Sequence, residues 1–436
     1  MLTLTAASCL KGTVDIPGDK SISHRAVMFG AISSGTTRVS HFLSGADCLS
    51  TVDCFRRLGV QIDFMPENGE VIVYGKGMRS LSPVSGPEAG LYTGNSGTTT
   101  RIISGILAPQ AFDSRLSGDA SINKRPMKRI MEPLSGMGAD IRSLNNNGCA
   151  PLIIHGKQLH GITYHSPVAS AQVKSAVLCA GLYADSPTTV IEPALSRDHT
   201  ERMLSLFGAD IRSENTSATV HPAEELYAAD ILVPGDISSA AYFIAAALLV
   251  PGSEVLIRNV GINPTRAGIL KIAKQMGADI TYLNENSSGE PTADLLVRSC
   301  PLKAAVIEGD IIPALIDEIP VLAVMAACAE GTTVIRNAAE LKVKESNRIE
   351  TVAENLRAMA VAVTPTEDGM IIEGGHGPYG SKPLAGAQIH THLDHRIAMS
   401  FAVASLIAQG ATVLDDENCV DISYPTFFRD LESLKV

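Results

Sequence analysis

The sequence predicts an α/β protein of two domains, each built from three βαβαββ units with mixed sheets around buried helices. Three repeated features support this prediction. An apolar helix followed by a tight turn and a β-branched strand occurs six times in the 436 residues. An amphipathic helix that ends in Gly and runs into a strand occurs four times. A Pro-Gly-Asp turn begins at Pro17 and again at Pro234, about half a chain length apart.

The apolar helices define the six units. A Gly or Pro follows each one and is succeeded by a short run typical of a strand. The six segments are Ala26–Ile32, Arg101–Leu107, Ala176–Leu182, Ala240–Val250, Val321–Ala329 and Ser400–Ala408.

The second repeated feature supplies the rest of each unit. Gly is favoured after the last turn of a helix because the chain there commonly adopts a left-handed conformation. The four copies are Leu58–Ile62, Met137–Ile141, Phe207–Ile211 and Met276–Ile280, and Met359-Ala360-Val361 is a weaker fifth copy without the Gly. Turn signals at Asn68-Gly69, Asn147-Gly148 and Asp368-Gly369 predict hairpins. Crossover helices join parallel strands and hairpins join antiparallel ones, so the sheets are mixed.

The Pro-Gly-Asp turns predict where the chain passes between domains. We expect one domain from residues 1–18 together with 236–436, and the other from 19–235. The sixth unit runs out of chain at Val436, so a strand near Leu10–Ile16 is expected to complete the C-terminal domain. We expect the active site in the cleft between the domains, with the two turns as hinges for closure on substrates.

Composition excludes several classes of function. Lys and Arg number 35 against 46 Asp and Glu, aromatic residues make up 4% and Trp is missing, which disfavours general nucleic-acid binding. The longest apolar run, Ala240–Val250, is too short to span a membrane. The first residues lack the basic start of an export signal. Eight scattered cysteines without a C-x-x-C pair indicate reduced thiols, so we expect a cytoplasmic protein without a metal site.

Polar clusters mark the starts of the six apolar helices. A helix N-terminus binds anions, although Ser, Thr, Asp and Asn there are also ordinary caps. Capping does not explain cations in first turns, where the helix dipole disfavours them. Lys20, Arg25, Arg101 and Arg396 are expected in first turns and therefore predict small anionic ligands.

Further cations flank other elements, at Lys124–Arg129, Ser196–His199 and Lys342–Arg348. Each is equally compatible with a solvated surface. The guanidinium fork suits carboxylates and phosphates, so several arginines predict a ligand with more than one anionic group. Asp317 and Glu318, at another helix start, are either a base that binds a hydroxyl or plain caps.

These clusters, in this order, resemble the 5-enolpyruvylshikimate-3-phosphate synthase family, and specifically its second bacterial subclass. The resemblance covers nearly the whole chain. The segments that carry it are Pro17–Arg25, Gly94–Arg101, Lys124–Pro126, Ala169–Lys174, Asp317–Pro320, Lys342–Arg348 and Asp394–Met399.

The resemblance implies transfer of the enolpyruvyl group of phosphoenolpyruvate to the 5-hydroxyl of shikimate 3-phosphate, by addition and elimination without metal or cofactor. It implies that Asp317, Lys20, Glu345 and Lys344 are catalytic. The implied shikimate 3-phosphate residues are Lys20, Ser21, Arg25, Ser170, Ala171 through its backbone, Gln172, Arg197, Asp317 and Lys344. The implied phosphoenolpyruvate residues are Lys20, Gly97, Arg125, Gln172, Arg348 and Arg396. The resemblance also implies a monomer. It implies inhibition by glyphosate, because Gly97 corresponds to the glycine that lines the family's site for phosphoenolpyruvate and glyphosate.

The chain departs from the family pattern in two places. No lysine precedes Tyr424-Pro425, which leaves one contact to phosphoenolpyruvate unassigned. Many members have Ser where this chain has Ala171, so only the backbone is available there.

Three alternatives remain at the level of sequence. The sister transferase that acts on UDP-N-acetylglucosamine has Lys-Asn where this chain has Lys20-Ser21, and usually a loop Cys that Ala108–Ala120 lacks. RNA end-processing cyclases use a similar repeat, but the acidic composition disfavours them. A binding protein without chemistry is the third alternative.

Overall fold

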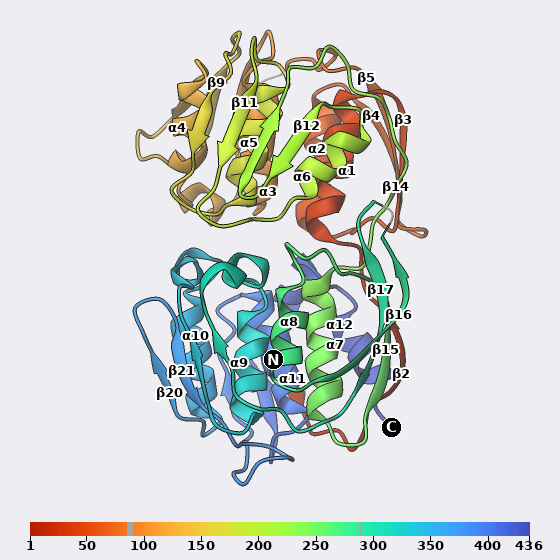
Figure 1. The fold of residues 1–436 in the computed structure, drawn as a ribbon, viewed down its shortest axis with the longest axis vertical. Helices are drawn as coiled ribbons and strands as arrows, with labels where there is room; N and C mark the ends of the chain where they lie inside the picture. Colours follow the sequence, from red (N-terminus) through yellow and green to blue (C-terminus); the bar gives the residue numbers. More distant parts are fainter. Residues whose placement is uncertain (85–89, 288) are drawn as a thin grey trace. The chain divides into compact units, whose positions relative to one another are not determined.

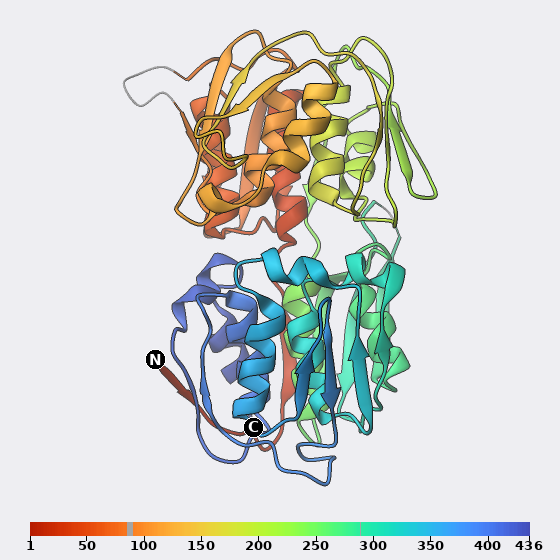
Figure 2. The ribbon, with the colours of Figure 1, turned by 90° about the vertical axis from the view of Figure 1, so that its left-hand side faces the viewer.

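The computed structural model describes residues 1–84, 90–287 and 289–436, and the chain divides into two compact units. The central unit is Gly18–Val233. The terminal unit combines Met1–Pro17 with Pro234–Val436. Each unit repeats one arrangement of strands and helices (Figures 1 and 2).

The sheets of the central unit share one strand order, in which the first two strands are parallel and the other neighbours antiparallel. The first repeat has the order β14(Ile231–Leu232)-β3(Ser34–Ser40)-β5(Glu70–Lys76)-β4(Gln61–Met65). The second is β6(Leu91–Tyr92)-β7(Asp113–Ser117)-β9(Leu152–His155)-β8(Asp140–Ser143). The third is β10(Thr163–His165)-β11(Thr188–Ile191)-β13(Ser217–Val220)-β12(Ile211–Glu214).

The terminal unit follows the same plan. Its sheets are β2(Lys11–Asp15)-β15(Glu254–Gly261)-β17(Thr292–Arg298)-β16(Asp279–Asn286), then β18(Val306–Ile307)-β19(Thr332–Ile335)-β21(Met370–Glu373)-β20(Val363–Pro365), then β22(Gln388–Ile389)-β23(Thr412–Leu414)-β1(Leu2–Leu4). The mixed α/β class predicted from the repeats is therefore confirmed.

The helices are of two kinds. The buried ones are α1(Lys20–Ile32), α3(Gly97–Leu107) and α5(Ala171–Gly181) in the central unit, and α7(Ile237–Leu249), α9(Ile319–Cys328) and α11(His395–Ser405) in the terminal unit. The others have an exposed face: α2(Ala46–Arg57), α4(Lys128–Gly136), α6(His199–Leu206), α8(Gly268–Gln275), α10(Arg348–Ala358) and α12(Phe427–Ser433). Short 3₁₀ turns lie at Ile122–Lys124, Gly309–Ala314, Ala339–Val343 and Asn418–Ile422.

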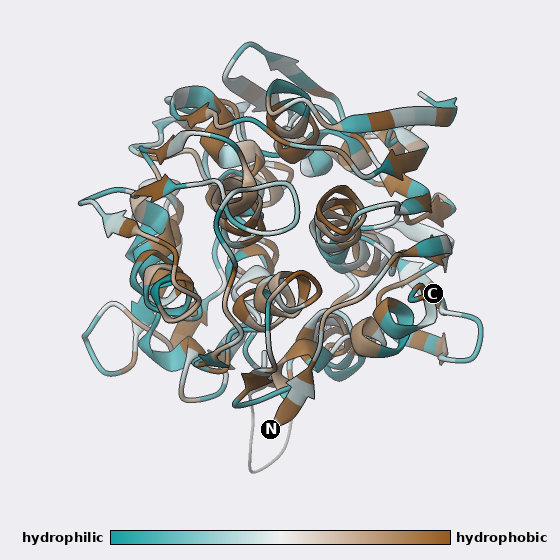
Figure 3. Cartoon of the chain, turned by 90° about the horizontal axis from the view of Figure 1, so that it is seen from below, coloured by the Kyte–Doolittle hydropathy of each residue, from teal (hydrophilic) through white to brown (hydrophobic). Residues whose placement is uncertain are grey.

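The core of each unit lies around its buried helices. Every residue of α7 is buried, and the hydropathy colouring in Figure 3 shows apolar residues on interior helices and polar ones on outer turns. In the central unit, Gly105 lets α3 approach α5 closely, because a Cβ at Gly105 would lie 2.0 Å from the carbonyl oxygen of Ala176.

Two edge strands come from distant parts of the chain. β14, at the end of the central unit, pairs parallel with β3 of the first repeat. β2, at the N-terminus, pairs parallel with β15, and the backbone N–H of Asp236 donates to the carbonyl of Pro17 at 2.9 Å. The incomplete sixth repeat is closed by β1, antiparallel to β23, rather than by the strand near residues 10–16.

The helix ends follow the predicted cap pattern. Gly59, Gly138, Gly208 and Gly277 have φ angles of 89°, 94°, 91° and 88°. Ala360, in the weaker fifth copy, takes the same left-handed conformation at φ 68°. The repeat therefore imposes its backbone geometry even where Gly is missing.

Candidate active site

The predicted polar clusters lie at helix N-termini, and several of their members are true caps. The side chains of Asp19 and Ser96 accept from backbone N–H groups of α1 and α3, at 2.9 and 3.1 Å. Asp236 and Asp394 do the same for α7 and α11, at 2.8 and 3.0 Å. The helices begin at these caps, so Arg25 and Arg101 lie in second turns rather than first turns, which corrects the sequence prediction.

In the central unit, α1 presents Lys20, Ser21 and Arg25. Lys20 forms an ion pair with Asp47 of α2. Arg25 is buried and donates to the carbonyl of Ser21 at 2.9 Å. Arg197, just before α6, donates to the Ser21 hydroxyl at 3.4 Å. The structure thus gathers Ser21, Arg25 and Arg197 in one place.

The N-termini of α3 and α5 meet through a second set of predicted residues. Nη1 of Arg101 donates to Oε1 of Gln172 at 2.6 Å, and the Gln172 amide donates to Thr98 at 3.0 Å. A Cβ placed on Gly97 would lie 2.7 Å from Nη1 of Arg101 and 3.6 Å from Nη1 of Arg125. Gly97 therefore borders two guanidinium groups, which suits an anionic ligand.

Asn95 fixes the second of these arginines. Arg125 donates to Oδ1 of Asn95 at 2.6 Å, and the Asn95 amide donates to Asp119 at 2.9 Å. Asn95 was part of a predicted helix-start cluster, but its role as a support for Arg125 appears only in the structure.

A buried charged triad lies behind the loops that carry Ser170 and Arg197. Nζ of Lys174 contacts Oε2 of Glu192 at 2.9 Å and Oε1 of Glu201 at 2.8 Å. Burial alone would lower the pKa of Lys174, but Glu201 and Glu192 raise it. Burial raises the pKa of Glu201 despite its cationic partner. The sequence offered no signal for Glu192, which simply follows a β-branched strand.

In the terminal unit, Asp317 lies just before α9 and among three cations. Its Oδ1 is 3.5 Å from Nζ of Lys344 and 3.4 Å from Nη1 of Arg348. Its Oδ2 is 3.9 Å from Nη2 of Arg396. Burial alone would lower the pKa of Arg396, but Asp317, with Tyr242 and Glu318, raises it well above its usual value. Positive charges around a carboxylate favour its ionised form.

Arg348 links Asp317 to two further carboxylates. Its side chain is fully buried and donates to Glu345 at 2.6 Å and to Asp394 at 2.8 and 3.1 Å. All five residues predicted from this half of the chain, Asp317, Lys344, Glu345, Arg348 and Arg396, therefore form one connected group.

Glu318 differs from its neighbour Asp317. It is buried and accepts from Arg266 at 2.9 Å, and Arg266 also contacts Asp236 at 3.3 Å. This buried network joins the starts of α7 and α9. Glu318 is thus structural, and Arg266 is a support that sequence analysis missed because it lies in a loop without a helix-start pattern.

Other polar features lie outside these groups. His390 lies 3.5 Å from Asp415, and His392 lies 3.3 Å from Glu354.

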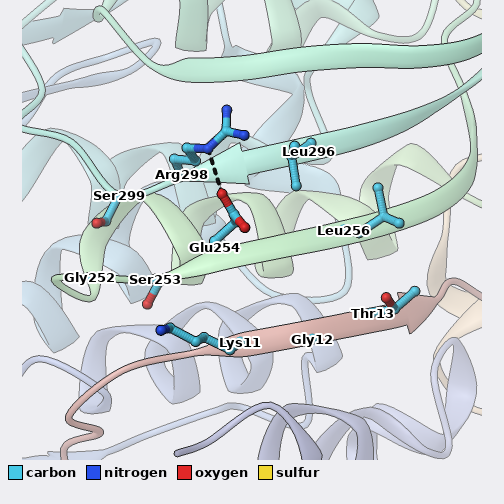
Figure 4. Close-up of a pocket in the computed structure, with 10 residues that line it drawn as sticks. All are labelled: Lys11, Gly12, Thr13, Gly252, Ser253, Glu254, Leu256, Leu296, Arg298 and Ser299. Atoms are coloured by element: carbon cyan, nitrogen blue, oxygen red, sulfur yellow. Dashed lines mark hydrogen bonds and ion pairs between the residues drawn. The ribbon is translucent and has the colours of Figure 1, made fainter.

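A pocket of about 620 Å³ opens over strands β2, β15 and β17, where Arg298 donates to Glu254 at 2.6 Å (Figure 4). Its lining includes none of the predicted site residues.

Known proteins share this architecture. The enolpyruvyl transferase NikO from Streptomyces tendae has the same fold, with a TM-score of 0.78 at 18% identity, covering 99% of this chain and 96% of that one. The fold is thus that of the enolpyruvyl transferases. A structure of EPSP synthase from Acinetobacter baumannii aligns with a TM-score of 0.88 at 48% identity, covering 99% of this chain and 97% of that one.

Sequence relatives specify the family. The proteins named 3-phosphoshikimate 1-carboxyvinyltransferase from Bacillus velezensis and Bacillus subtilis are 54% and 52% identical, each over 98% of this chain and 97% of the relative. The family model for EPSP synthase (3-phosphoshikimate 1-carboxyvinyltransferase) matches residues 4–431. The chain belongs to the EPSP synthase family.

The structure also bears on membrane association. Within residues 1–84, 90–287 and 289–436, none of the helices has the length and apolar character needed to cross a bilayer.

Proposed function

We propose that this chain transfers the enolpyruvyl group of phosphoenolpyruvate to the 5-hydroxyl of shikimate 3-phosphate and releases phosphate, as a step of the shikimate pathway. Membership of the EPSP synthase family supports the overall reaction. The observation that carries the chemistry is Asp317, a carboxylate in contact with Lys344, Arg348 and Arg396. A base surrounded by cations suits a reaction between two anionic substrates.

Shikimate 3-phosphate carries a phosphate and a carboxylate, and we assign its binding to residues of both units. In the central unit, Ser21 lies within reach of Arg25 and Arg197. A hydroxyl and two guanidinium groups that lie close together can all donate hydrogen bonds to one phosphate or carboxylate group. The full set is Lys20, Ser21, Arg25, Ser170, Ala171 through its backbone, Gln172, Arg197, Asp317 and Lys344.

Phosphoenolpyruvate is assigned to the remaining arginines. Arg125 borders Gly97, and a small residue there leaves room for a ligand against the guanidinium. Arg348 and Arg396 lie on either side of Asp317. The full set is Lys20, Gly97, Arg125, Gln172, Arg348 and Arg396.

The chemical steps follow from the substrates. Asp317, with Lys344 beside it, accepts the proton of the 5-hydroxyl as its oxygen bonds to C2 of phosphoenolpyruvate. A proton is added to C3 in the same addition, and Glu345 and Lys20 are the candidate donors. Loss of a C3 proton and of phosphate from the tetrahedral adduct then restores the double bond. The cations stabilise the negative charge that moves through these steps.

We also propose a role for each of the two units. The central and terminal units act as the two domains of the enzyme, and residues of both act on the same two substrates. We further propose a cytoplasmic monomer that glyphosate inhibits, since Gly97 leaves the space beside Arg125 open.

One assay tests the overall proposal. We expect phosphate release from phosphoenolpyruvate that depends on shikimate 3-phosphate. UDP-N-acetylglucosamine as the alternative acceptor is the control, and should support no release. Release that depended on UDP-N-acetylglucosamine, or none with either acceptor, would refute the assignment.

A further inference from the structure

Glu192 lies where two loops of the central unit meet. Its Oε1 accepts from the backbone N–H of Ser170 at 2.9 Å. Its Oε2 accepts from the hydroxyl of Ser196 at 2.8 Å. Ser170 is the N-cap residue of α5, and Ser196 is the chain neighbour of Arg197. One buried carboxylate therefore ties the loop of Ser170 to the loop of Arg197.

Lys174 holds this carboxylate from the opposite side. Its ammonium group contacts Oε2 of Glu192 at 2.9 Å, and the Lys174 and Glu192 side chains are 2% and 1% exposed. A buried carboxylate needs such a partner, because leaving a charge unpaired in the interior is strongly unfavourable. The position of Glu192, and with it the spacing of the two loops, is thus fixed from within the unit.

We infer that Glu192 is a positioning residue for shikimate 3-phosphate, because it sets the separation of Ser170 and Arg197. This inference rests on the proposed function, which places both residues on that substrate. Ser170 and Arg197 lie at the starts of α5 and α6, and these two helices also hold Arg25, a third residue assigned to shikimate 3-phosphate. Arg25 donates to Ser175 of α5 and to Thr200 of α6, each at 2.7 Å. Phosphoenolpyruvate residues such as Arg125 are held by a different partner, Asn95.

The chain offers a matched control for Glu192. Glu201 belongs to the same triad, is buried, and contacts the same ammonium group at 2.8 Å. In the part of the chain that the structure describes, its Oε2 accepts no hydrogen bond. An amide therefore fits at residue 201, with its oxygen towards Lys174 and its NH₂ group in place of Oε2.

An amide does not fit at residue 192. Glu192 accepts at both oxygens, whereas an amide has one acceptor and one donor. If its oxygen faces Ser170, its NH₂ group faces the ammonium of Lys174. Turned the other way, its NH₂ group faces the Ser170 N–H. Glu192→Gln therefore loses the Ser170 contact in one orientation and sets its NH₂ group against the Lys174 ammonium in the other, and the second orientation is disfavoured because two donors face each other.

The experiment compares Glu192→Gln with Glu201→Gln in the full-length enzyme. We measure thermal midpoint, kcat, and KM for each substrate. We expect Glu192→Gln to raise the KM for shikimate 3-phosphate about tenfold, while the KM for phosphoenolpyruvate changes less than about threefold. Glu201→Gln should lower the thermal midpoint but leave both KM values within about threefold.

Hydrogen exchange gives a second readout that does not depend on activity. The Ser170 amide should exchange faster in Glu192→Gln than in Glu201→Gln. A folded Glu192→Gln enzyme with an unchanged KM for shikimate 3-phosphate would overturn the inference, as would equal effects of the two variants. Failure of the proposed function would show instead as a wild-type enzyme without activity that depends on shikimate 3-phosphate.

Discussion

Arg348 and Asp394 form a two-point ion pair in the interior of the terminal unit, with N–O distances of 2.8 and 3.1 Å. The pair joins the first residue of α10 to the N-cap of α11. Asp394 also caps the backbone N–H of Arg396. A single carboxylate thus connects two of the arginines assigned to phosphoenolpyruvate.

Replacing Asp394 should destabilise the protein in a pH-dependent way. Burial alone would raise the pKa of Asp394, but Arg348 lowers it below its usual value. The pair therefore stabilises the fold at pH values above about 4, and this contribution is lost as the pH falls through the folded-state pKa. We expect Asp394→Asn to lose about 3 kcal/mol at pH 7, because the buried Arg348 loses its two-point partner and keeps only its contacts with Glu345 and Asp317. Urea unfolding of the wild type and of Asp394→Asn at several pH values measures the difference in their free energies of unfolding. This difference should become smaller below pH 4. A difference that did not change with pH would contradict a stabilising role of the ion pair.

His24 provides a second pH dependence, at less acidic pH. Burial, with Lys20 and Arg25 nearby and only Asp47 opposing, lowers its pKa to about 3. Its Nδ1 shares a 2.7 Å hydrogen bond with Thr51. The unfolded chain binds a proton at His24 below pH 6.5 and the folded protein does not, so stability falls as the pH falls from 6.5 towards 3.

The test compares wild type with His24→Asn, which keeps a polar group near Thr51. Between pH 7 and pH 5 the wild type should lose about 2 kcal/mol more of its free energy of unfolding than the variant does. Equal losses over this pH interval would show that His24 does not titrate as its burial predicts.

Asp317→Asn should act on the chemical step. The change keeps size and shape but removes the carboxylate proposed as the base, so we expect kcat to fall about 10²-fold or more. Thermal midpoints confirm folding, and Asp310→Asn, at an exposed acidic residue of the same region, serves as control. A near-normal kcat for Asp317→Asn would remove it from acid–base chemistry.

Gly97→Ala should weaken phosphoenolpyruvate binding and inhibition by glyphosate. The added Cβ meets Nη1 of Arg101 at 2.7 Å, so that side chain must move and strain its bond to Gln172. We expect the KM for phosphoenolpyruvate to rise about tenfold, which corresponds to about 1.4 kcal/mol. Gly136→Ala is the matched control, because its Cβ meets only Ile162 at 3.9 Å. Unchanged inhibition in a glyphosate titration of Gly97→Ala would count against this site.

Ala360→Gly should stabilise the protein. Ala360 has φ 68°, and an L-residue in the left-handed conformation costs about 1–2 kcal/mol relative to Gly. The greater freedom of Gly in the unfolded chain offsets about half of this gain. We expect a net gain of about 0.5–1 kcal/mol in urea unfolding, whereas Ala358→Gly, within α10, should lose a similar amount. A loss of stability in Ala360→Gly would show that the cap is not strained.

The repeats made much of this fold predictable. Gly59 and Gly277 marked helix ends, and clusters such as Asp19–Arg25 marked helix starts, because both signals act over a few residues. The pairing of β14 with β3 and of β2 with β15 was not predictable in detail, because edge strands of two or five residues carry little pattern of their own.

At the candidate site, the sequence predicted the residues at helix starts but not the residues that support them. Most of the residues assigned to the substrates lie at helix starts, where the charges of Arg396 and Asp317 are evident in the sequence. Supporting residues such as Glu192 and Arg266 act through partners distant in sequence, and nothing in their local sequence distinguishes them. Only a three-dimensional structure brings such partners together.

The pairing of β2 with β15 constrains the order in which the chain folds during synthesis. β2 ends at Asp15, but its partner β15 begins only at Glu254, so β2 has no partner strand until more than half of the polypeptide has been synthesised. Residues 18–233 lie wholly within that interval and contain the strands of their own sheets. The nascent chain can therefore complete this segment first, while its opening residues stay unpaired and exposed to chaperones and proteases.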